Sequence, residues 1–220
     1  MFSDGLGDVA ARGVYPGQDS PLKRLMDLII TCPLIFFLAP LMAVIWLLLK
    51  VFEPGPALFS HQRIGRGGRA FMVYKFRTMR TDASERLEQL LSADPGAAAE
   101  WATYQKLRND PRVTRFGQFL RRSSLDELPQ LLNILRGDMS VLGPRPVTLS
   151  EMRRYGAFRH YYAAVRPGLI GLWQVRGRNA LTYNQRVALD VEYVKTWSLW
   201  KDLKILIEAV PLVLSCRGAY

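Results

Sequence analysis

One uncharged apolar run, Leu28–Leu49, is long enough to cross a membrane, yet it contains two prolines. A helix over these residues could span the ~30 Å hydrocarbon layer of a bilayer. Pro33 and Pro40 each remove a backbone donor and crowd the preceding helical turn. A bend at Pro40 would leave two short arms, and Leu41–Leu49 alone could not cross the layer.

Basic residues flank this run on both sides, and such flanks prefer the cytoplasmic side of a membrane. Lys23 and Arg24 precede the run, and seven basic residues follow it: Lys50, Arg63, Arg66, Arg69, Lys75, Arg77 and Arg80. A helix that enters one leaflet and returns accounts for both flanks. We therefore expect a re-entrant helix–break–helix over residues 21–52. A single-pass helix with a tolerated proline kink is the alternative.

The net charge of +11 predicts anionic partners. The distribution of this charge along the chain indicates which class of anion is expected. Residues 50–80 and 143–178 are basic, whereas residues 82–100 hold five carboxylates and one arginine. This alternation favours phosphate-binding loops on a membrane-proximal body, so we expect no nucleic-acid partner. Cys32 and Cys216 give no disulfide framework and are typical of reduced cytoplasmic thiols.

The remaining pattern predicts an α/β fold, mostly α with a few short strands. Residues 1–20 are expected to be a mobile tail. Ala57–Gln62 and Ala70–Phe76 are expected to form a hairpin around a Gly-Gly turn, and Met139–Leu142 a short extended piece. Arg166–Asn179 is expected to be a loop. Helical spacing is found in Thr81–Leu107 (interrupted at Pro95), Phe116–Arg122, Leu125–Leu135, Glu151–Ala164, Tyr183–Lys195 and Asp202–Leu214.

The last of these helices has tryptophan and lysine residues at its border. Trp197, Trp200 and Lys201 precede its apolar part, which is the pattern of a helix at a membrane interface. A terminal helix that docks on the globular domain is an equally good interpretation.

Asp126 and Glu127 are the acidic residues best placed for chemistry. They follow Ser123 and Ser124 at an expected helix start, where the helix dipole favours ionised carboxylates. An ionised aspartate near Arg121 and Arg122 could hold Mg²⁺ or attack a phosphoryl group. Capping explains the pair more simply, either as a box between Ser124 and Glu127 or with Asp126 as the cap.

Three further basic side chains are arranged to bind phosphate. Prolines on both sides of Arg145 fix its backbone, which reduces the ordering needed for bidentate binding. Lys75 and Arg77 lie on one face of an expected strand. An incidental surface turn and a solvated charged strand face are the alternatives.

Taken in order, these segments resemble the bacterial sugar transferases that act as polyprenyl-phosphate hexose-1-phosphate transferases and initiate exopolysaccharide or glycan assembly. The resemblance covers about Leu22 to Tyr220. It rests on Lys23–Asp27, the proline-broken helix, Tyr74–Met79, Asp110–Thr114, Ser124–Leu131, Gly137–Ser140, Gly143–Pro146 and Arg166–Asn179.

The resemblance implies a role for each matching residue. Asp126 matches the family's nucleophile and metal ligand, for Mg²⁺, and Glu127 its dyad partner. Pro40 matches the proline that breaks the membrane helix; Ala39 replaces the serine that some relatives have there. Residues expected to bind substrate phosphates are Arg121, Arg145, Lys75, Arg77, Arg166 and Arg178.

The resemblance also implies a function. Residues 53–220 would form a cytoplasmic catalytic domain with interfacial helices, held monotopically on the bacterial inner membrane. Its partners would be membrane lipid, a nucleotide-diphosphate sugar such as UDP-glucose or UDP-galactose, and polyprenyl (undecaprenyl) phosphate. The reaction would pass through an aspartyl-phosphosugar, and a homodimer is compatible with it. A non-catalytic, membrane-tethered binding or scaffold protein is the alternative.

Overall fold

The computed structural model describes residues 15, 20–104, 107, 110–177 and 180–214. The expected tail falls almost entirely outside the described residues, as do Arg178 and Cys216. The described part is mostly helical with a few short strands, which confirms that part of the expected fold class.

Helices and short strands follow one another along the chain. Their bounds are α1 (Pro21–Phe52), β1 (Leu58–Ile64), β2 (Ala70–Phe76), α2 (Ala83–Ala93), α3 (Pro95–Tyr104), α4 (Arg115–Arg122), α5 (Gln130–Arg136), β3 (Ser140–Leu142), α6 (Leu149–Arg154), α7 (Arg159–Ala164), β4 (Gly168–Ile170), α8 (Leu172–Arg176), α9 (Tyr183–Lys195) and α10 (Leu199–Leu214), with 3₁₀ turns η2 (Arg66–Gly68), η3 (Leu125–Glu127) and η4 (Gly156–Phe158).

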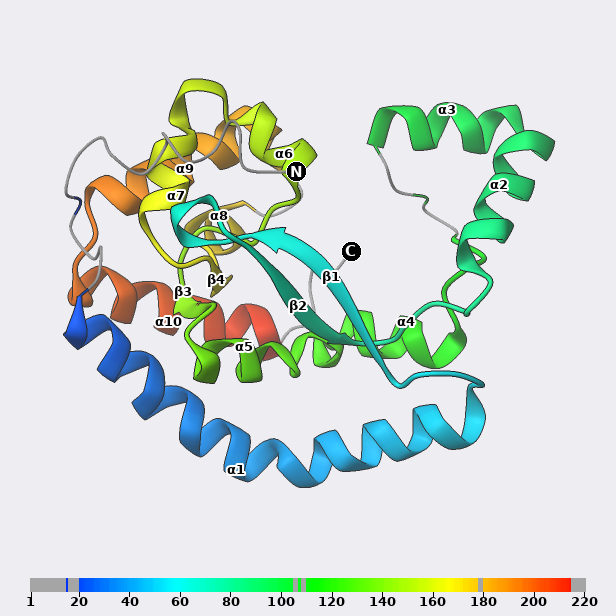
Figure 1. Cartoon of the computed structure of the whole chain (residues 1–220), viewed down its shortest axis with the longest axis horizontal. Helices are drawn as coiled ribbons and strands as arrows, with labels where there is room; N and C mark the ends of the chain where they lie inside the picture. The colour runs from blue at the N-terminus through cyan, green and yellow to red at the C-terminus, as the bar shows by residue number, and fades with distance from the viewer. Residues whose placement is uncertain (1–14, 16–19, 105–106, 108–109, 178–179, 215–220) are drawn as a thin grey trace.

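The β1–β2 hairpin crosses the middle of the molecule (Figure 1) and confirms the expected hairpin. The strands are antiparallel, with Leu58 opposite Phe76 and Ile64 opposite Ala70. Gly67 and Gly68 make the turn with φ values of 67° and 74°. Residues that carry a side chain rarely adopt such positive values. Val73 and Phe76, both on β2, are buried in two different clusters of core residues. The strand therefore packs against the core of the protein.

Helix α1 runs along the lower edge of the molecule in Figure 1 and bends part-way. The Ser20 side chain caps its start, and the helix remains continuous over 32 residues through Pro33 and Pro40. The expected break is therefore a bend within one helix. In the described part of the chain, α1 is the one helix long and apolar enough to cross a membrane. The re-entrant topology stays a prediction.

One stripe of α1 packs against the rest of the protein at both ends of the helix. Ile45 and Leu49 pack against Ala57, Phe76 and Leu120, close to the C-terminal end. The other side of the helix is apolar and exposed, with Phe36 76% and Phe37 75% accessible. An exposed apolar side on a helix of this length is typical of contact with lipid.

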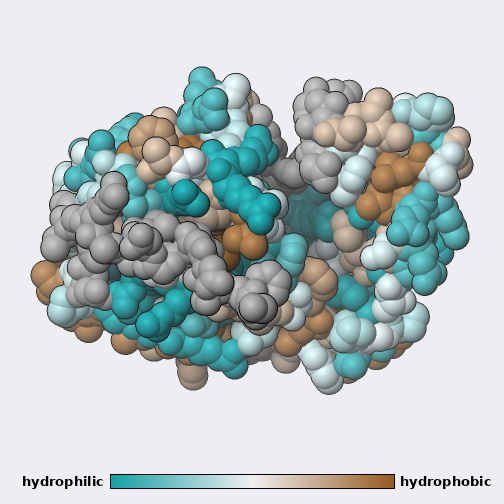
Figure 2. Space-filling model, turned by 45° about the horizontal axis from the view of Figure 1, so that its top comes forward, coloured by the Kyte–Doolittle hydropathy of each residue, from teal (hydrophilic) through white to brown (hydrophobic). Residues whose placement is uncertain are grey.

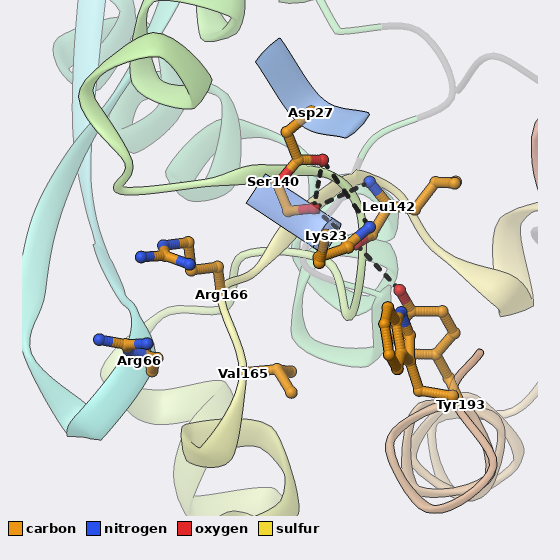
Figure 3. A pocket seen from close by; sticks show the side chains of 9 residues that line it. Lys23, Asp27, Arg66, Ser140, Leu142, Val165, Arg166 and Tyr193 are labelled. Atoms are coloured by element: carbon orange, nitrogen blue, oxygen red, sulfur yellow. Dashed lines mark hydrogen bonds and ion pairs between the residues drawn. The ribbon is translucent and has the colours of Figure 1, made fainter. Parts of the chain in front are cut away.

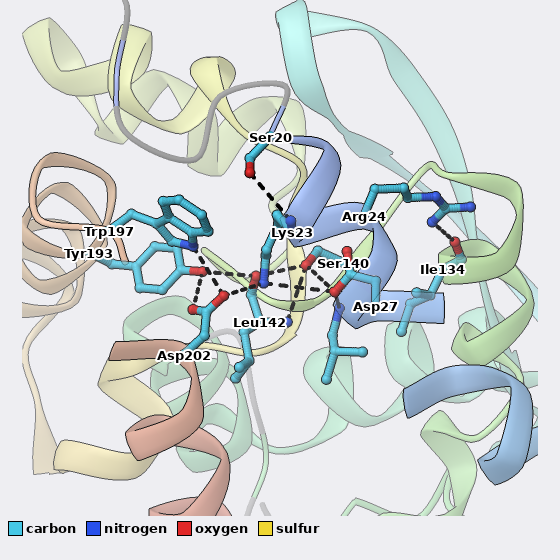
Figure 4. Close-up of polar contacts among 11 residues, drawn as sticks. Ser20, Lys23, Arg24, Asp27, Ile134, Ser140, Leu142, Tyr193, Trp197 and Asp202 are labelled. Carbon is cyan, nitrogen blue, oxygen red and sulfur yellow. Dashed lines mark hydrogen bonds and ion pairs between the residues drawn. The ribbon is translucent and has the colours of Figure 1, made fainter. Parts of the chain in front are cut away.

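A buried polar network joins the start of α1 to α10 (Figure 4). We call it the α1–α10 network; its members are Lys23, Asp27, Ser140, Tyr193 and Asp202. Lys23 Nζ lies 2.6 Å from Asp202 Oδ2, and the Tyr193 hydroxyl donates to Asp202 Oδ1 at 2.7 Å. Asp27 Oδ1 accepts from the Ser140 hydroxyl at 2.9 Å. The network holds the first turns of α1 against β3 and α10.

Helix α10 corresponds to the segment for which docking on the domain and contact with a membrane interface were both expected. Asp202, Ile205 and Ala209 are buried against the protein, so the helix docks. Trp200 is 63% exposed, and Leu203, Ile207 and Val210 also reach the surface. An interfacial role for this second, apolar face stays a prediction.

Three expected elements are wrong. Arg166–Asn179 is not simply a loop, because it contains β4 and α8. β4 pairs with β3 in parallel, and a Cβ on Gly168 would lie 2.1 Å from the nitrogen of Gly143. Leu125–Leu135 is not one helix, because η3 comes first and α5 begins only at Gln130. The expected helix Glu151–Ala164 is likewise divided, at Gly156.

Candidate active site

The acidic pair lies in the three-residue turn η3, between α4 and α5. Ser124 enters this turn at φ 57°, the only positive φ of a non-glycine residue among the described residues. The Ser124 side chain makes no capping hydrogen bond, and α5 starts after Pro129 without a side-chain cap. Both versions of the capping interpretation are therefore wrong. The Asp126 and Glu127 carboxylates face other elements instead.

Glu127 is held by two cations from distant parts of the chain. Its Oε1 accepts from Lys75 Nζ at 2.6 Å and from Arg145 Nη2 at 2.8 Å. Burial raises the pKa of Glu127, but the charges of Arg145 and Lys75 outweigh burial and lower the pKa to about 2. Glu127 is therefore a permanent anion at neutral pH, and a poor proton acceptor.

Asp126 is buried but only loosely paired. It is 7% exposed, and its Oδ2 lies 3.5 Å from Lys75 Nζ. Burial raises the pKa of Asp126, with Lys75 and Arg121 opposing the rise and Glu127 adding to it. The expected stabilisation by a helix start is absent, because no α-helix begins here. The neighbouring cations favour the ionised form, but burial outweighs them, and the pKa of Asp126 stays above its ordinary value.

Arg121, on α4, lies close enough to the Asp126 carboxylate for the two charges to interact. Thr114 caps this helix by accepting from the Gly117 nitrogen at 2.8 Å. Seven residues later, Arg121 donates its Nε to the Thr78 hydroxyl at 2.9 Å. Burial lowers the pKa of Arg121, and the charges of Asp126 and Asp110 oppose that effect. Arg121 is thus a half-buried cation beside Asp126.

Arg145 enters from the turn between β3 and α6. Glu127 raises the pKa of Arg145, so the guanidinium is a fixed positive charge. Arg63, on β1, lies close enough for Arg145 to affect its charge; burial lowers the pKa of Arg63 and Glu151 raises it. The sequence did not single out Arg63, since its strand pattern resembles an ordinary solvated edge.

Two predicted phosphate-binding residues lie away from the dyad. Arg77 donates Nη2 to the carbonyl of Glu53 at 3.0 Å, beneath the turn that follows α1. Arg166 donates Nε to the carbonyl of Gly137 at 2.8 Å. It lines a different pocket with Arg66 and Lys23 (Figure 3). The prediction for Arg178 lies outside the described residues.

A hydrophilic hollow separates the body of the molecule from the part formed by α2 and α3 (Figure 2). The β1–β2 hairpin runs between the body and the α2–α3 part in Figure 1. The exposed apolar side of α1 lies along the opposite edge of the molecule.

The donor set fits a magnesium ion that is completed by substrate. No group of three or more metal-binding side chains occurs in the described ranges. Mg²⁺ usually binds proteins through one or two carboxylates and takes its other ligands from water and phosphates. Glu127 Oε1 already accepts from two cations, whereas Asp126 has one looser contact, with Lys75 at 3.5 Å, so Asp126 is the less committed of the two carboxylates.

Comparison with known proteins places the chain in a family. The bacterial sugar transferase family model matches residues 18–216, and the chain belongs to that family. It is 48% identical over 200 residues to the undecaprenyl-phosphate galactose phosphotransferase of Salmonella typhimurium, covering 90% of this chain and 42% of the relative. It is 46% identical over 198 residues to the exopolysaccharide production protein ExoY of Rhizobium meliloti, covering 90% and 88%.

A third relative carries a different sugar in its name. The UDP-glucose:undecaprenyl-phosphate glucose-1-phosphate transferase of Caulobacter vibrioides is 44% identical over 208 residues, covering 90% of this chain and 72% of the relative. The chain spans 42% of the length of the galactose phosphotransferase and of two other similar relatives. The family match over residues 18–216 contains both acidic residues, Asp126 and Glu127, and the long apolar helix.

Proposed function

We propose that this protein transfers a hexose 1-phosphate from a nucleotide-diphosphate sugar to polyprenyl phosphate, and so starts the assembly of an exopolysaccharide or another glycan. One observation carries the proposal: the Asp126 carboxylate is loosely paired and surrounded by Lys75, Arg121 and Arg145. Relatives named for galactose and glucose transfer support a plain hexose as the sugar.

The first step forms a covalent intermediate on Asp126. A carboxylate oxygen attacks the phosphorus that bears the sugar, and an Asp–O–P bond forms. The bond between the two phosphates breaks, and a nucleoside monophosphate leaves with the electron pair. Arg121 and Arg145 offset the repulsion between the carboxylate and the diphosphate and stabilise the charge on the leaving group.

The second step regenerates the free Asp126 carboxylate. A phosphate oxygen of the polyprenyl phosphate attacks the same phosphorus, the Asp–O–P bond breaks, and a lipid-linked diphosphate sugar is released. Glu127 keeps Lys75 and Arg145 in place throughout, since it remains ionised. Because Asp126 meets the soluble and the lipid substrate in turn, both need not occupy the site together.

Magnesium fits this scheme as an ion that the Asp126 carboxylate would bind. When bound, it would neutralise charge on the donor diphosphate and make the phosphorus easier to attack. The protein's own residues position the reacting groups around it: Glu127 orients Lys75 and Arg145, and the Asp126 carboxylate supplies the protein ligand.

The membrane helix supports a location on the cytoplasmic face of the inner membrane, with residues 53–220 as the catalytic domain. Both ends of α1 pack on the same domain, Lys23 at one end and Leu49 at the other. A spanning helix would have to give up one set of contacts. Single cysteines placed in residues 1–20 and near Arg66 should be labelled from the same side. Labelling from opposite sides would contradict the re-entrant topology.

The decisive test uses the sugar donor without the lipid acceptor. Purified enzyme with Mg²⁺ should release nucleoside monophosphate from UDP-glucose or UDP-galactose and become labelled by radioactive sugar phosphate. A panel of nucleotide sugars identifies the donor. No release and no labelling with any donor, while the protein still binds membranes, would favour a scaffold or binding protein.

A further inference from the structure

Thr78, which follows β2, is a meeting point of two segments that build the active site. Its carbonyl accepts a hydrogen bond from the Thr114 nitrogen at 3.1 Å, at the start of α4. Its hydroxyl accepts from Arg121 Nε at 2.9 Å, in the last turn of the same helix. The residue is buried, so both bonds are shielded from water.

Gly117 brings α4 unusually close to Thr78. A Cβ on Gly117 would lie 2.1 Å from the Thr78 carbonyl oxygen, a distance that only glycine permits. The Thr114 cap, the Gly117 approach and the Arg121 hydrogen bond therefore hold one face of α4 against one residue. This packing fixes the position of the Arg121 backbone and the direction in which the Arg121 side chain leaves the helix.

The hydrogen bond to Thr78 restricts the guanidinium itself. An arginine side chain has about 2 kcal/mol of rotamer freedom, and its planar fork binds phosphate well only when its orientation is fixed. A bond to Nε fixes the plane of the guanidinium and leaves its two terminal NH₂ groups for a ligand. Arg121 is already close enough to Asp126 for the two charges to interact.

We propose that Thr78 is a positioning residue whose hydroxyl orients Arg121 toward the diphosphate of the nucleotide-sugar donor beside Asp126. The inference rests on the proposed function of Arg121. Thr78 itself acts only through the arginine, because its hydroxyl is directed to Nε. A valine keeps the branched shape but cannot accept the hydrogen bond, whereas a serine keeps the acceptor.

The test is a double-mutant cycle on donor turnover without acceptor. Thr78→Val should lower kcat/KM for the donor about 10- to 100-fold, the range for a lost hydrogen bond to a charged group. Thr78→Ser should restore most of that loss. In an Arg121→Ala background, Thr78→Val should change turnover less than about twofold, because the residue through which it acts is already gone.

The outcomes separate the two proposals. Normal turnover by Arg121→Ala would remove the phosphate-binding role of Arg121 and this inference with it. A damaging Arg121→Ala with a harmless Thr78→Val, or with an undiminished effect of Thr78→Val in the double variant, would overturn the inference alone. Thr31→Val is the matched control, since its buried hydroxyl has no hydrogen-bond partner. If Thr78→Val does not fold, the Thr78→Ala and Thr78→Ser pair replaces it.

Discussion

The active site and the α1–α10 network contain the same ingredients, two carboxylates and one lysine, which are buried in the network and only partly buried at the active site. In the network, Asp202 accepts from Lys23, Tyr193 and the indole of Trp197, and Asp27 from Ser140. At the dyad of Asp126 and Glu127, Glu127 Oε1 accepts from both Lys75 and Arg145. Asp126 differs, because its one charged contact in the described structure is Lys75 Nζ at 3.5 Å.

The difference shows how one set of residue types can serve structure or chemistry. A buried carboxylate whose oxygens are hydrogen-bonded stabilises the fold and is expensive to disturb. A buried carboxylate with few donors keeps its lone pairs available for a phosphorus atom or a metal ion. The number of donors, rather than the acid itself, therefore distinguishes Asp126 from Asp202.

The largest effect should come from Asp126→Asn. A neutral amide neither attacks phosphorus nor binds Mg²⁺ well, so donor-alone release should fall on the order of 10⁴-fold or more. Folding should survive, because burial already disfavours the charged form of Asp126. Release of nucleoside monophosphate is the measurement. Near-normal release would remove Asp126 as the nucleophile.

Asp202→Asn should have the opposite profile, because it breaks the network and leaves the dyad intact. The Lys23 ammonium would lose its 2.6 Å partner in a buried place, which costs about 3–5 kcal/mol of stability. Thermal unfolding in detergent gives the loss, and turnover per folded molecule should change little. Glu192→Gln is the control, since its pairs with Arg176 and Lys201 are partly exposed and worth about 1 kcal/mol or less.

Arg145→Lys should lower turnover on the order of 10²-fold while leaving folding intact. A lysine keeps the charge but cannot donate to Glu127 and to a substrate phosphate through a planar fork. Steady-state kinetics with the donor measure the effect. Arg176→Lys is the matched control, at an exposed arginine that pairs with Glu192. Equal kinetics for the two variants would contradict the phosphate-binding role of Arg145.

Asp190 extends the comparison to a third buried carboxylate, with one donor, the Tyr155 hydroxyl at 2.7 Å. Burial raises the pKa of Asp190 from 3.8 to about 7. The folded protein therefore binds a proton between these values, and the stabilisation is complete below about pH 4 and lost as pH rises through about 7.

Asp190→Asn removes this titration. The variant should be more stable than the wild type above pH 7, by at most about 4 kcal/mol, and the advantage should shrink toward pH 4. Thermal unfolding across this pH range measures it. A constant difference between the two proteins at every pH would show that Asp190 does not titrate as described.

The sequence predicted those features that depend on local patterns. The hairpin around Gly67 and the helix Tyr183–Lys195 are of this kind. The form of the dyad turn was not predictable, because Ser124 and Glu127 have capping-box spacing. Lys75 and Arg145, 52 and 18 residues away, take the Glu127 carboxylate instead.

Partners of the arginines were also beyond local patterns. Arg77 comes directly after β2 rather than on it, and a carbonyl at the end of α1 is its acceptor. Thr78 gave no signal, because a threonine after a strand is ordinary. Its importance depends on Gly117, a residue 39 positions later whose missing side chain allows α4 to approach.

The pairing of Lys23 with Asp202 has a consequence for biosynthesis. The two residues are 179 positions apart, so a ribosome working at about 5–20 residues per second needs about 10–40 s between them. During that interval the apolar helix is already complete, but Lys23 lacks its 2.6 Å partner and has only Asp27, 3.7 Å away on the same helix. The helix can reach its final packing only after Asp202 has been translated, so the docking of α10 completes the placement of α1.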